Sequence, residues 1–324
     1  MVGMKEARYD WPEVVTFGES MGLLTPVGTK GIEYAGQFEK SFAGAESNFA
    51  IGVSRLGHRA GWFGRLGDDP FGRYILKRIR GEGVDVSRAV LTAEAPTGII
   101  IREFVAGKSS VYYYRRHTAA SLIRPEHLDE QYIGQARFLH VTGITPALSA
   151  SCRETVREAV RVARKQGVII CFDPNVRLKL WSLDEARPVL LELARQADYF
   201  LPGLDELKLL YGTDDIERLA AKLAELPGVS IVKGGGTETY IVERGAVRSV
   251  PYVPVERVVD PVGAGDGFCA GFVVGLLKGY ALEEAVRLAN RVGAMVVQAP
   301  GDWEGLPTWD EVEAALNERA HIER

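Results

Sequence analysis

The chain has 324 residues, 46% of them hydrophobic and 25% charged, and its formal net charge is -4. This length and composition fit one large α/β domain, and the lack of a basic excess argues against nucleic-acid binding. The sequence shows neither a signal-peptide core nor an apolar run of membrane length, so we expect a cytoplasmic protein that does not bind membranes.

In chain order, the first predicted elements are a short strand and two helices. Val14–Phe17 is an apolar, strand-like run, and a helix is expected from about Ser47 to about Leu56. Asp69 followed by Pro70 is typical of a helix start, because an N-cap residue precedes a proline at the first helical position.

Two β-rich runs come next, Thr97–Val105 and Ser109–Arg116, on either side of Ala106-Gly107-Lys108. Their composition and the short connection predict a hairpin. Because no helix lies between the two runs, the alternation of strands and helices is interrupted at this point.

Strands and helices alternate again from Phe138 onward. Phe138–Val141 and Val168–Phe172 are apolar strands, and the capping boxes that begin at Ser151 and Ser182 open helices. Such alternation predicts a mostly parallel sheet with helices on both faces. Ligands bind these sheets beyond the carboxyl ends of the strands. Polar residues follow several predicted strands there: Glu19, Asp173, Asn175 and Lys233.

The most informative stretch runs from Asp260 to Gly279. A small-residue turn, Gly263-Ala264-Gly265, leads to Asp266 and then to a helix that is apolar nearly all round, which predicts burial. Free backbone N–H groups at the start of a helix attract anions. A carboxylate beside them fits phosphoryl transfer, with Asp266 as the general base. The alternative is that Asp266 only caps the helix and that the glycines serve packing.

Two signatures resemble those of the ribokinase-like (PfkB) carbohydrate kinases. Asp260-Pro-Val-Gly-Ala-Gly-Asp266 is similar to the C-terminal signature of that family, and Gly44-Ala-Glu-Ser-Asn48-Phe-Ala is similar to the N-terminal one. The resemblance covers about residues 14–302. It implies a three-layer α/β/α fold with a mostly parallel central sheet. It also implies a single kinase domain over 1–324, with a β lid formed from about 22–42 and 97–116 that covers the sugar.

The resemblance also implies roles for the residues of the two signatures. Asp266 would take the proton of the attacking hydroxyl group, and the N–H groups of Gly263, Ala264 and Gly265 would hold the transferred phosphoryl group. Gly44 and Asn48 would contact sugar hydroxyls, although Asn48 also fits a helix N-terminal residue. For Asp260, a monovalent-cation ligand and a purely structural role remain open.

For ATP and Mg²⁺, the resemblance points to three further places. The family's Asn-x-x-Glu metal motif corresponds to Gly203-Leu-Asp-Glu206, so Glu206 matches while glycine replaces the asparagine. Lys233-Gly234-Gly235-Gly236 is similar to the nucleotide loop, so Lys233 and Gly235 are candidate nucleotide residues, although Glu238 stands where a last glycine is expected. Asn290 falls where the adenine pocket lies. The alternatives are a solvated Glu206, an ordinary glycine turn and a helix-surface Asn290. No Walker-type motif occurs, which argues against a P-loop kinase.

Two motifs bear on the acceptor. Asp173-Pro-Asn-Val-Arg177 is similar to the Asp-x-Asn-x-Arg motif of several sugar kinases, a resemblance that leaves both phosphate and substrate open as the ligand of Arg177. The run that contains Tyr113, Arg115 and Arg116 most resembles 2-keto-3-deoxygluconate kinases, and fructokinases carry a related segment. Adjacent strand residues point to opposite faces, so only one of the two arginines can face a pocket, and we choose Arg115.

The resemblance thus predicts an enzyme, an ATP- and Mg²⁺-dependent sugar kinase that acts on a primary hydroxyl of a small sugar acid. The expected reaction converts 2-keto-3-deoxygluconate to 2-keto-3-deoxy-6-phosphogluconate, in a homo-oligomer. The alternatives are a fructokinase or another PfkB sugar kinase, more distantly a nucleoside kinase, and a non-catalytic sugar-binding regulator on the same fold.

Overall fold

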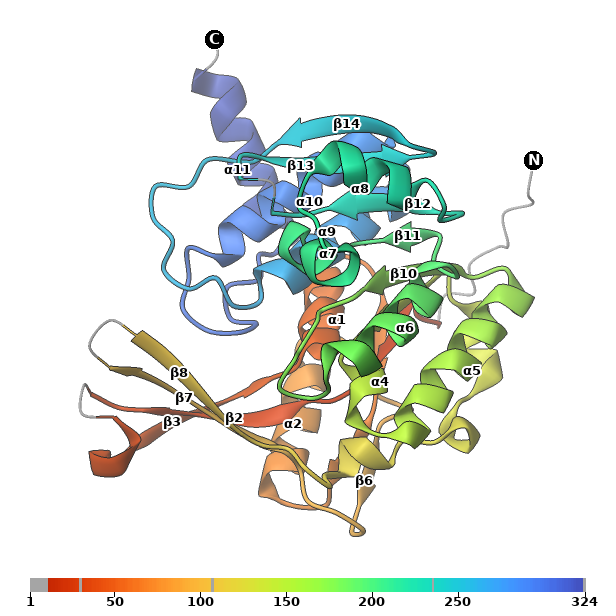
Figure 1. Ribbon diagram of the computed structural model, residues 1–324. Helices are drawn as coiled ribbons and strands as arrows, with labels where there is room; N and C mark the ends of the chain where they lie inside the picture. The colour runs from red at the N-terminus through yellow and green to blue at the C-terminus, as the bar shows by residue number, and fades with distance from the viewer. Residues whose placement is uncertain (1–10, 29–30, 106–107, 235, 323–324) are drawn as a thin grey trace.

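A computed structural model describes residues 11–28, 31–105, 108–234 and 236–322, and an eight-stranded sheet lies at its centre (Figure 1). In spatial order the strands are β14 (Ala246–Pro251), β13 (Glu238–Glu243), β12 (Val229–Val232), β11 (Tyr199–Phe200), β10 (Ile169–Asp173), β9 (Phe138–Thr142), β1 (Val14–Phe17) and β4 (Ala60–Phe63). All neighbouring strands from β12 to β4 pair in parallel, and β13 and β14 add an antiparallel hairpin at one edge.

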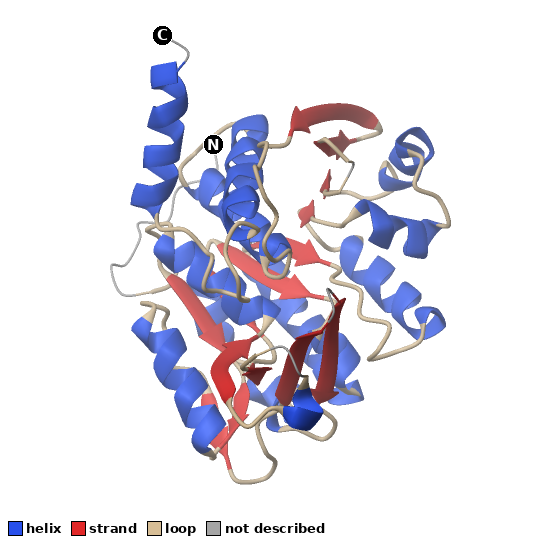
Figure 2. Ribbon diagram, turned by 90° about the vertical axis from the view of Figure 1, so that its left-hand side faces the viewer, coloured by secondary structure: helices blue, strands red, loops and turns tan. Residues whose placement is uncertain are grey.

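Helices cover both faces of this sheet (Figure 2). On one face the core includes α1 (Ala45–Arg55), α2 (Pro70–Gly81), α9 (Ala264–Leu277), α10 (Leu282–Val296) and α11 (Trp309–Ile322). On the other face it includes α3 (Glu130–Gln135), α5 (Ala150–Gln166), α6 (Leu183–Ala194), α7 (Leu204–Tyr211) and α8 (Ile216–Leu223), with the short α4 (Thr145–Leu148) beside them.

The apolar strands explain these layers. Val14 belongs to the core on one face and its neighbour Val15 to the core on the other, because successive strand residues alternate between faces. A strand buried on both faces reads as a continuous apolar run. The predicted three-layer α/β/α fold with a mostly parallel sheet is confirmed. Within the described residues, no helix combines the length and apolarity needed to cross a bilayer.

A second, four-stranded sheet projects from the body (Figure 1). It consists of β3 (Phe38–Ala43), β2 (Met21–Pro26), β7 (Ile99–Val105) and β8 (Lys108–Tyr114), in that order. β7 and β8 form the antiparallel hairpin expected from the sequence, and β7 pairs in parallel with β2. Strands from both stretches predicted to form the lid therefore lie in one sheet. A small parallel pair, β5 (Arg65–Gly67) and β6 (Val90–Thr92), completes the strands.

Candidate active site

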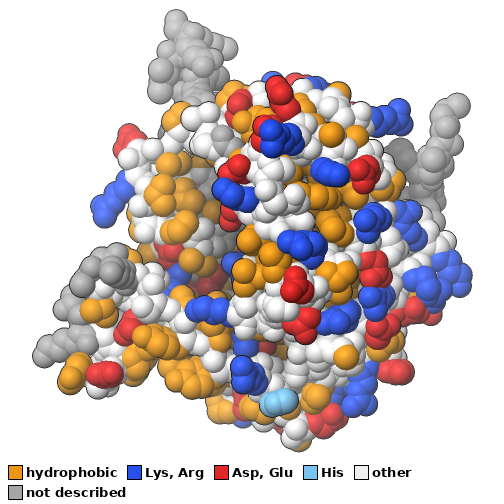
Figure 3. Space-filling model, in the orientation of Figure 1, with side chains coloured by type: hydrophobic (Ala, Val, Ile, Leu, Met, Phe, Trp, Pro, Cys, Tyr) orange, Lys and Arg blue, Asp and Glu red, His pale blue; other side chains and the backbone are white. Residues whose placement is uncertain are grey.

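A cavity of about 760 Å³ lies between the second sheet and the carboxyl ends of the central strands. The space-filling view shows a hollow between the projecting sheet and the body (Figure 3). The cavity wall includes ten of the residues singled out from the sequence: Gly44, Asn48, Tyr113, Arg115, Arg177, Glu206, Lys233, Gly263, Gly265 and Asp266. Several groups of contacts determine what this cavity can do.

The turn before α9 forms one wall of the cavity. Gly263 has φ 78°, which favours glycine, and a Cβ at this position would lie 2.0 Å from the carbonyl oxygen of Asp302. The N–H of Ala264 makes a long contact of 3.4 Å with the Pro261 carbonyl. The N–H groups of Gly263 and Gly265 make no backbone hydrogen bond to any residue that the structure describes. They are therefore available to an anion at the start of this helix.

Close packing fixes α9 behind the turn. A Cβ on Gly271 would come within 3.0 Å of the Ala289 Cα, and one on Gly275 within 2.7 Å of the Ala285 Cα. The helix therefore lies directly against the backbone of α10, and the glycines that are costly in an isolated helix allow this approach. The result is a rigid base for the turn and for Asp266 in the first turn of α9.

Asp266 lies beside a second carboxylate and an asparagine that bridges the two. The Asn48 Nδ2 donates to Asp266 Oδ2 at 2.8 Å and to Asp302 Oδ1 at 3.4 Å. Burial and the nearby charges of Asp173 and Asp302 raise the pKa of Asp266 to about 8, although the Asn48 hydrogen bond opposes this. Burial also raises the pKa of Asp302 to about 6. A carboxyl group with a pKa near neutrality suits a general base.

At the ends of β10 and β12, a lysine pairs with an aspartate. Lys233 Nζ lies 3.1 Å from Asp173 Oδ1, and both side chains are largely buried. Burial alone would lower the pKa of Lys233, but the negative charges around it, those of Asp173 and Glu206 among them, together outweigh burial and keep the pKa raised. Lys233 is thus a fixed positive charge at the strand ends.

Glu206 uses both carboxylate oxygens to hold the backbone. Its Oε1 accepts from the Val176 N–H and its Oε2 from the Gly203 N–H, each at 2.7 Å. Burial and the charge of Asp173 raise the pKa of Glu206. Among the residues that the structure describes, no group of three or more acidic, histidine or cysteine side chains is placed to bind a metal. A metal ion here would need most of its ligands from water and from a bound phosphate.

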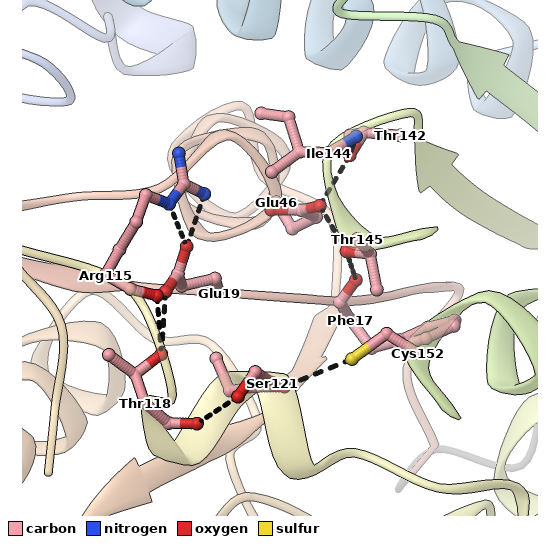
Figure 4. A network of polar contacts seen from close by, with 11 residues as sticks. Phe17, Glu19, Glu46, Arg115, Thr118, Ser121, Thr142, Ile144, Thr145 and Cys152 are labelled. Carbon is pink, nitrogen blue, oxygen red and sulfur yellow. Dashed lines mark hydrogen bonds and ion pairs between the residues drawn. The ribbon is translucent and has the colours of Figure 1, made fainter. Parts of the chain in front are cut away.

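A buried ion pair joins the residue after β8 to the loop between β1 and β2 (Figure 4). Arg115 donates to Glu19 Oε2 through Nε at 2.8 Å and through Nη2, and Thr118 Oγ1 donates to Glu19 Oε1 at 3.2 Å. The side chains of Arg115 and Glu19 are 9% and 1% exposed. The guanidinium also lies 5.4 Å from the centre of the Tyr113 ring, as alternation along a strand predicts. Arg116 is exposed and does not line the cavity.

A second buried carboxyl group, Glu46, lies near this pair (Figure 4). Its Oε1 accepts from Thr142 Oγ1 at 2.6 Å and from Thr145 Oγ1 at 2.8 Å. Burial, together with the charge of Glu19, raises the pKa of Glu46. By contrast, Arg177 is exposed at the cavity wall and forms no ion pair with the described residues. Its charge acts on Asp266, whose pKa it lowers, but no carboxylate of the described residues forms an ion pair with it.

Four predicted residues lie elsewhere or outside the described residues. Asn290 does not line the cavity. Its Oδ1 accepts from Thr239 Oγ1, and its Nδ2 donates to carbonyl groups of β14. Ala264 and Asp260 are also absent from the cavity wall, although Gly263 beside Ala264 lines it. Asp260 instead pairs with Arg102 at 2.9 Å. Gly235 falls outside the described residues.

The site also contains residues that the sequence analysis did not assign to it. These are Glu46, Arg102 and Asp302. The sequence analysis expected Glu19 at this edge of the sheet, but it did not predict the pairing of Glu19 with Arg115. Arg102 is two residues from Ile100 on β7, so alternation could have placed both on one face. We find no sequence signal for Asp302.

Comparisons with known proteins identify a family and several relatives of this chain. The family described as pfkB family carbohydrate kinase matches residues 12–309. A Bacillus subtilis (strain 168) protein named 2-dehydro-3-deoxygluconokinase is 40% identical over 94% of this chain and 95% of its own length. One of the same name from Thermoproteus tenax is 37% identical over 96% of each chain.

A solved structure adds a structural comparison. A putative ribokinase II from E. coli, in complex with ATP and Mg²⁺, superposes with a TM-score of 0.86 over 95% of this chain and 99% of its own, at 26% identity. The family resemblance seen in the two signatures is confirmed.

Proposed function

Because the chain belongs to the pfkB family of carbohydrate kinases and is a phosphotransferase, we propose that its acceptor is 2-keto-3-deoxygluconate, also called 2-dehydro-3-deoxygluconate. It transfers the γ-phosphoryl group of ATP to a primary hydroxyl and forms 2-keto-3-deoxy-6-phosphogluconate and ADP. The names of the two relatives support this acceptor, and so do the arginines Arg115 and Arg177 in the cavity wall.

The observation that carries the proposal is the position of Asp266. Its carboxylate lies in the cavity in the first turn of α9, one residue after the turn whose N–H groups are available. The hydroxyl oxygen forms a bond to the γ-phosphorus, its proton passes to Asp266, and the bond to the ADP oxygen breaks. The N–H groups of Gly263 and Gly265, with that of Ala264, stabilise the charge on the transferred group.

A sugar acid brings a carboxylate that loses water in the cavity and needs a charged partner. Arg115 alone supplies little net charge, because Glu19 already accepts from two of its nitrogens. We assign the net positive charge to Arg177 and the orientation of the acid to Arg115 and Tyr113. We assign the sugar hydroxyls to Gly44 and Asn48, which line the cavity, and Asn48 also donates to Asp266.

For the nucleotide, Lys233, Gly263 and Gly265 remain the candidates in the cavity, and Gly235 stays a prediction. Asn290 is already hydrogen-bonded within the protein, so we do not assign it to adenine. Magnesium ions commonly bind one or two carboxylates, water and substrate phosphates. Asp205 and Glu206 fit that mode, with Glu206 acting through water because its oxygens hold Val176 and Gly203. Bound there, Mg²⁺ would neutralise phosphate charge.

A monovalent cation at Asp260 fits the structure poorly. Arg102 already places a guanidinium 2.9 Å from Asp260 Oδ2, and a further cation at that oxygen would meet a like charge. We therefore leave the cation out of the reaction.

Two wider features of the chain remain proposals. The second sheet lines the cavity with Leu23, Ile100, Val111 and Tyr113, which supports its role as a lid within a single kinase domain. The homo-oligomer stays a prediction.

The acceptor can be tested with coupled ADP detection on 2-keto-3-deoxygluconate, 2-keto-3-deoxygalactonate, fructose and a nucleoside. We expect the highest kcat/KM for the first compound. Arg177→Ala should lower kcat/KM for the sugar acids by at least about tenfold, the scale of a charged hydrogen bond, and should spare slow turnover of fructose. A preference for fructose would contradict the sugar-acid assignment. Inactivity on every acceptor, with sugar binding retained, would favour the non-catalytic regulator.

A further inference from the structure

An ion pair joins the second sheet to the turn that precedes α9. Arg102 lies on β7, and its Nη1 is 2.9 Å from Oδ2 of Asp260, which is 158 residues further along the chain. The two side chains are only 16% and 17% exposed. Arg102 lines the cavity together with Ile100 and Val111, so it approaches the turn from the cavity side of the sheet.

Asp260 in turn holds the start of the turn in place. Its Oδ1 accepts from the Val262 N–H at 3.1 Å, and its Oδ2 accepts from the Gly301 N–H at 3.4 Å. The backbone N–H of Asp260 donates to the Val297 carbonyl at 3.2 Å. One carboxylate thus connects the turn, the segment after α10 and the second sheet.

The charge of Arg102 matters because the site is rich in carboxylates. The charges of Glu304 and Asp260 raise the pKa of Asp302, and the charge of Asp302 raises the pKa of Asp266. Among the groups around Asp302, Arg102 lowers its pKa most. Without Arg102, Asp260 would be a largely buried carboxylate with no cation beside it among the described residues. Such a charge would repel both the neighbouring carboxylates and an incoming phosphoryl group.

We propose that Arg102 is a positioning residue for phosphoryl transfer: through Asp260 it fixes the turn that carries the N–H groups of residues 263–265. Its guanidinium supplies, from within the chain, the positive charge that a monovalent cation would otherwise supply at Asp260. Because β7 belongs to the second sheet, the same contact links the position of that sheet to the shape of the phosphate-binding turn. This inference rests on the proposed kinase function, but its first test does not require turnover.

The first test is amide hydrogen exchange of a peptide that spans residues 259–266, in the full chain without ligands. Arg102→Gln and Asp260→Asn should each speed exchange in this peptide by about tenfold, the scale of a lost charged hydrogen bond. Arg102→Lys, which keeps the charge, should lie between wild type and Arg102→Gln. The matched control is Arg157→Gln, which breaks the Arg157–Glu192 pair between α5 and α6 and should leave the peptide unchanged. Unchanged exchange in both Arg102→Gln and Asp260→Asn would overturn the proposal.

The second test separates positioning from binding. Arg102→Gln should lower kcat about tenfold and change the acceptor KM by less than about threefold, because the variant removes the contact that fixes the turn and keeps Arg115, Arg177 and Tyr113, which we assign to the sugar acid. The wild-type rate should be the same in potassium and in tetramethylammonium salts. Activation of the wild type by potassium would overturn the claim that Arg102 supplies this charge. If no acceptor is phosphorylated, the proposed function fails, and the exchange experiment still decides the role of Arg102.

Discussion

Removal of Arg115 should destabilise the fold, because it leaves Glu19 buried without its cation. The side chain of Glu19 is 1% exposed, and Arg115 provides two of its three hydrogen bonds from side chains. Breaking a buried pair by removing one partner commonly costs about 3–5 kcal/mol. We therefore expect Arg115→Ala to lower the free energy of unfolding by about that amount at pH 7.

Two companion variants distinguish this cost from simple loss of a side chain. In the double variant Arg115→Ala with Glu19→Gln, no buried charge remains, so much of the stability should return. The matched control is Arg157→Ala, whose pair with Glu192 is 37% and 38% exposed. Loss of such a surface pair should cost about 0–1 kcal/mol.

The stability loss in Arg115→Ala should depend on pH in a defined direction. Burial already raises the pKa of Glu19 in the wild type, and Arg115 opposes that rise. Without Arg115 the pKa of Glu19 in the folded state should rise further above its unfolded value. The loss of unfolding free energy in Arg115→Ala relative to wild type should therefore shrink as the pH falls toward about 4.3, the pKa of a glutamate in the unfolded chain. The loss should grow as the pH rises.

Urea unfolding of the four proteins between pH 5 and pH 8, with a constant m-value, measures these differences. The reasoning is refuted if Arg115→Ala costs no more than Arg157→Ala at pH 7, or if Glu19→Gln restores nothing.

Three further predictions concern the base, the metal and the helix packing. In the free enzyme, kcat/KM should rise with pH through about 8, the pKa of Asp266, because the base must be ionised. Asn48→Ala removes a hydrogen bond that lowers this pKa, so the rise should move to higher pH. A kcat/KM that does not change with pH would contradict the assignment of Asp266 as the base. Glu206→Gln should raise the Mg²⁺ concentration for half-maximal rate, and an unchanged titration would place the metal elsewhere. Gly275→Ala puts a Cβ 2.7 Å from the Ala285 Cα and should cost about 1–3 kcal/mol in urea unfolding; a neutral effect would mean that α9 and α10 separate easily.

The features that the sequence predicts well are those with a local or periodic cause. The α9 helix follows from an apolar run, and the parallel strands follow from their alternation with helices. Asp173 and Lys233 meet because the carboxyl ends of parallel strands share one edge of a sheet. Asp266 joins them because its helix packs against that same sheet.

Other features depend on contacts between distant segments, which local patterns do not encode. Alternation along the strand predicts that Arg115 faces the cavity. Its pairing with Glu19 depends on where the end of β8 lies relative to the end of β1, which no local pattern encodes. Asp260 fits a cation site by its motif, whereas the approach of Arg102 follows from the placement of the second sheet. Asn290 fits a ligand residue by motif, yet the β13–β14 hairpin supplies hydrogen-bond partners for its amide.

The most direct test of the account is the turnover of Asp266→Asn with 2-keto-3-deoxygluconate and ATP. The asparagine keeps an oxygen for the Asn48 hydrogen bond but cannot take the hydroxyl proton. We predict that kcat falls by about 10²–10⁴, the usual contribution of a general base, while calorimetry gives a sugar-acid Kd close to that of the wild type. Turnover near the wild-type rate would contradict the central claim that Asp266 is the base.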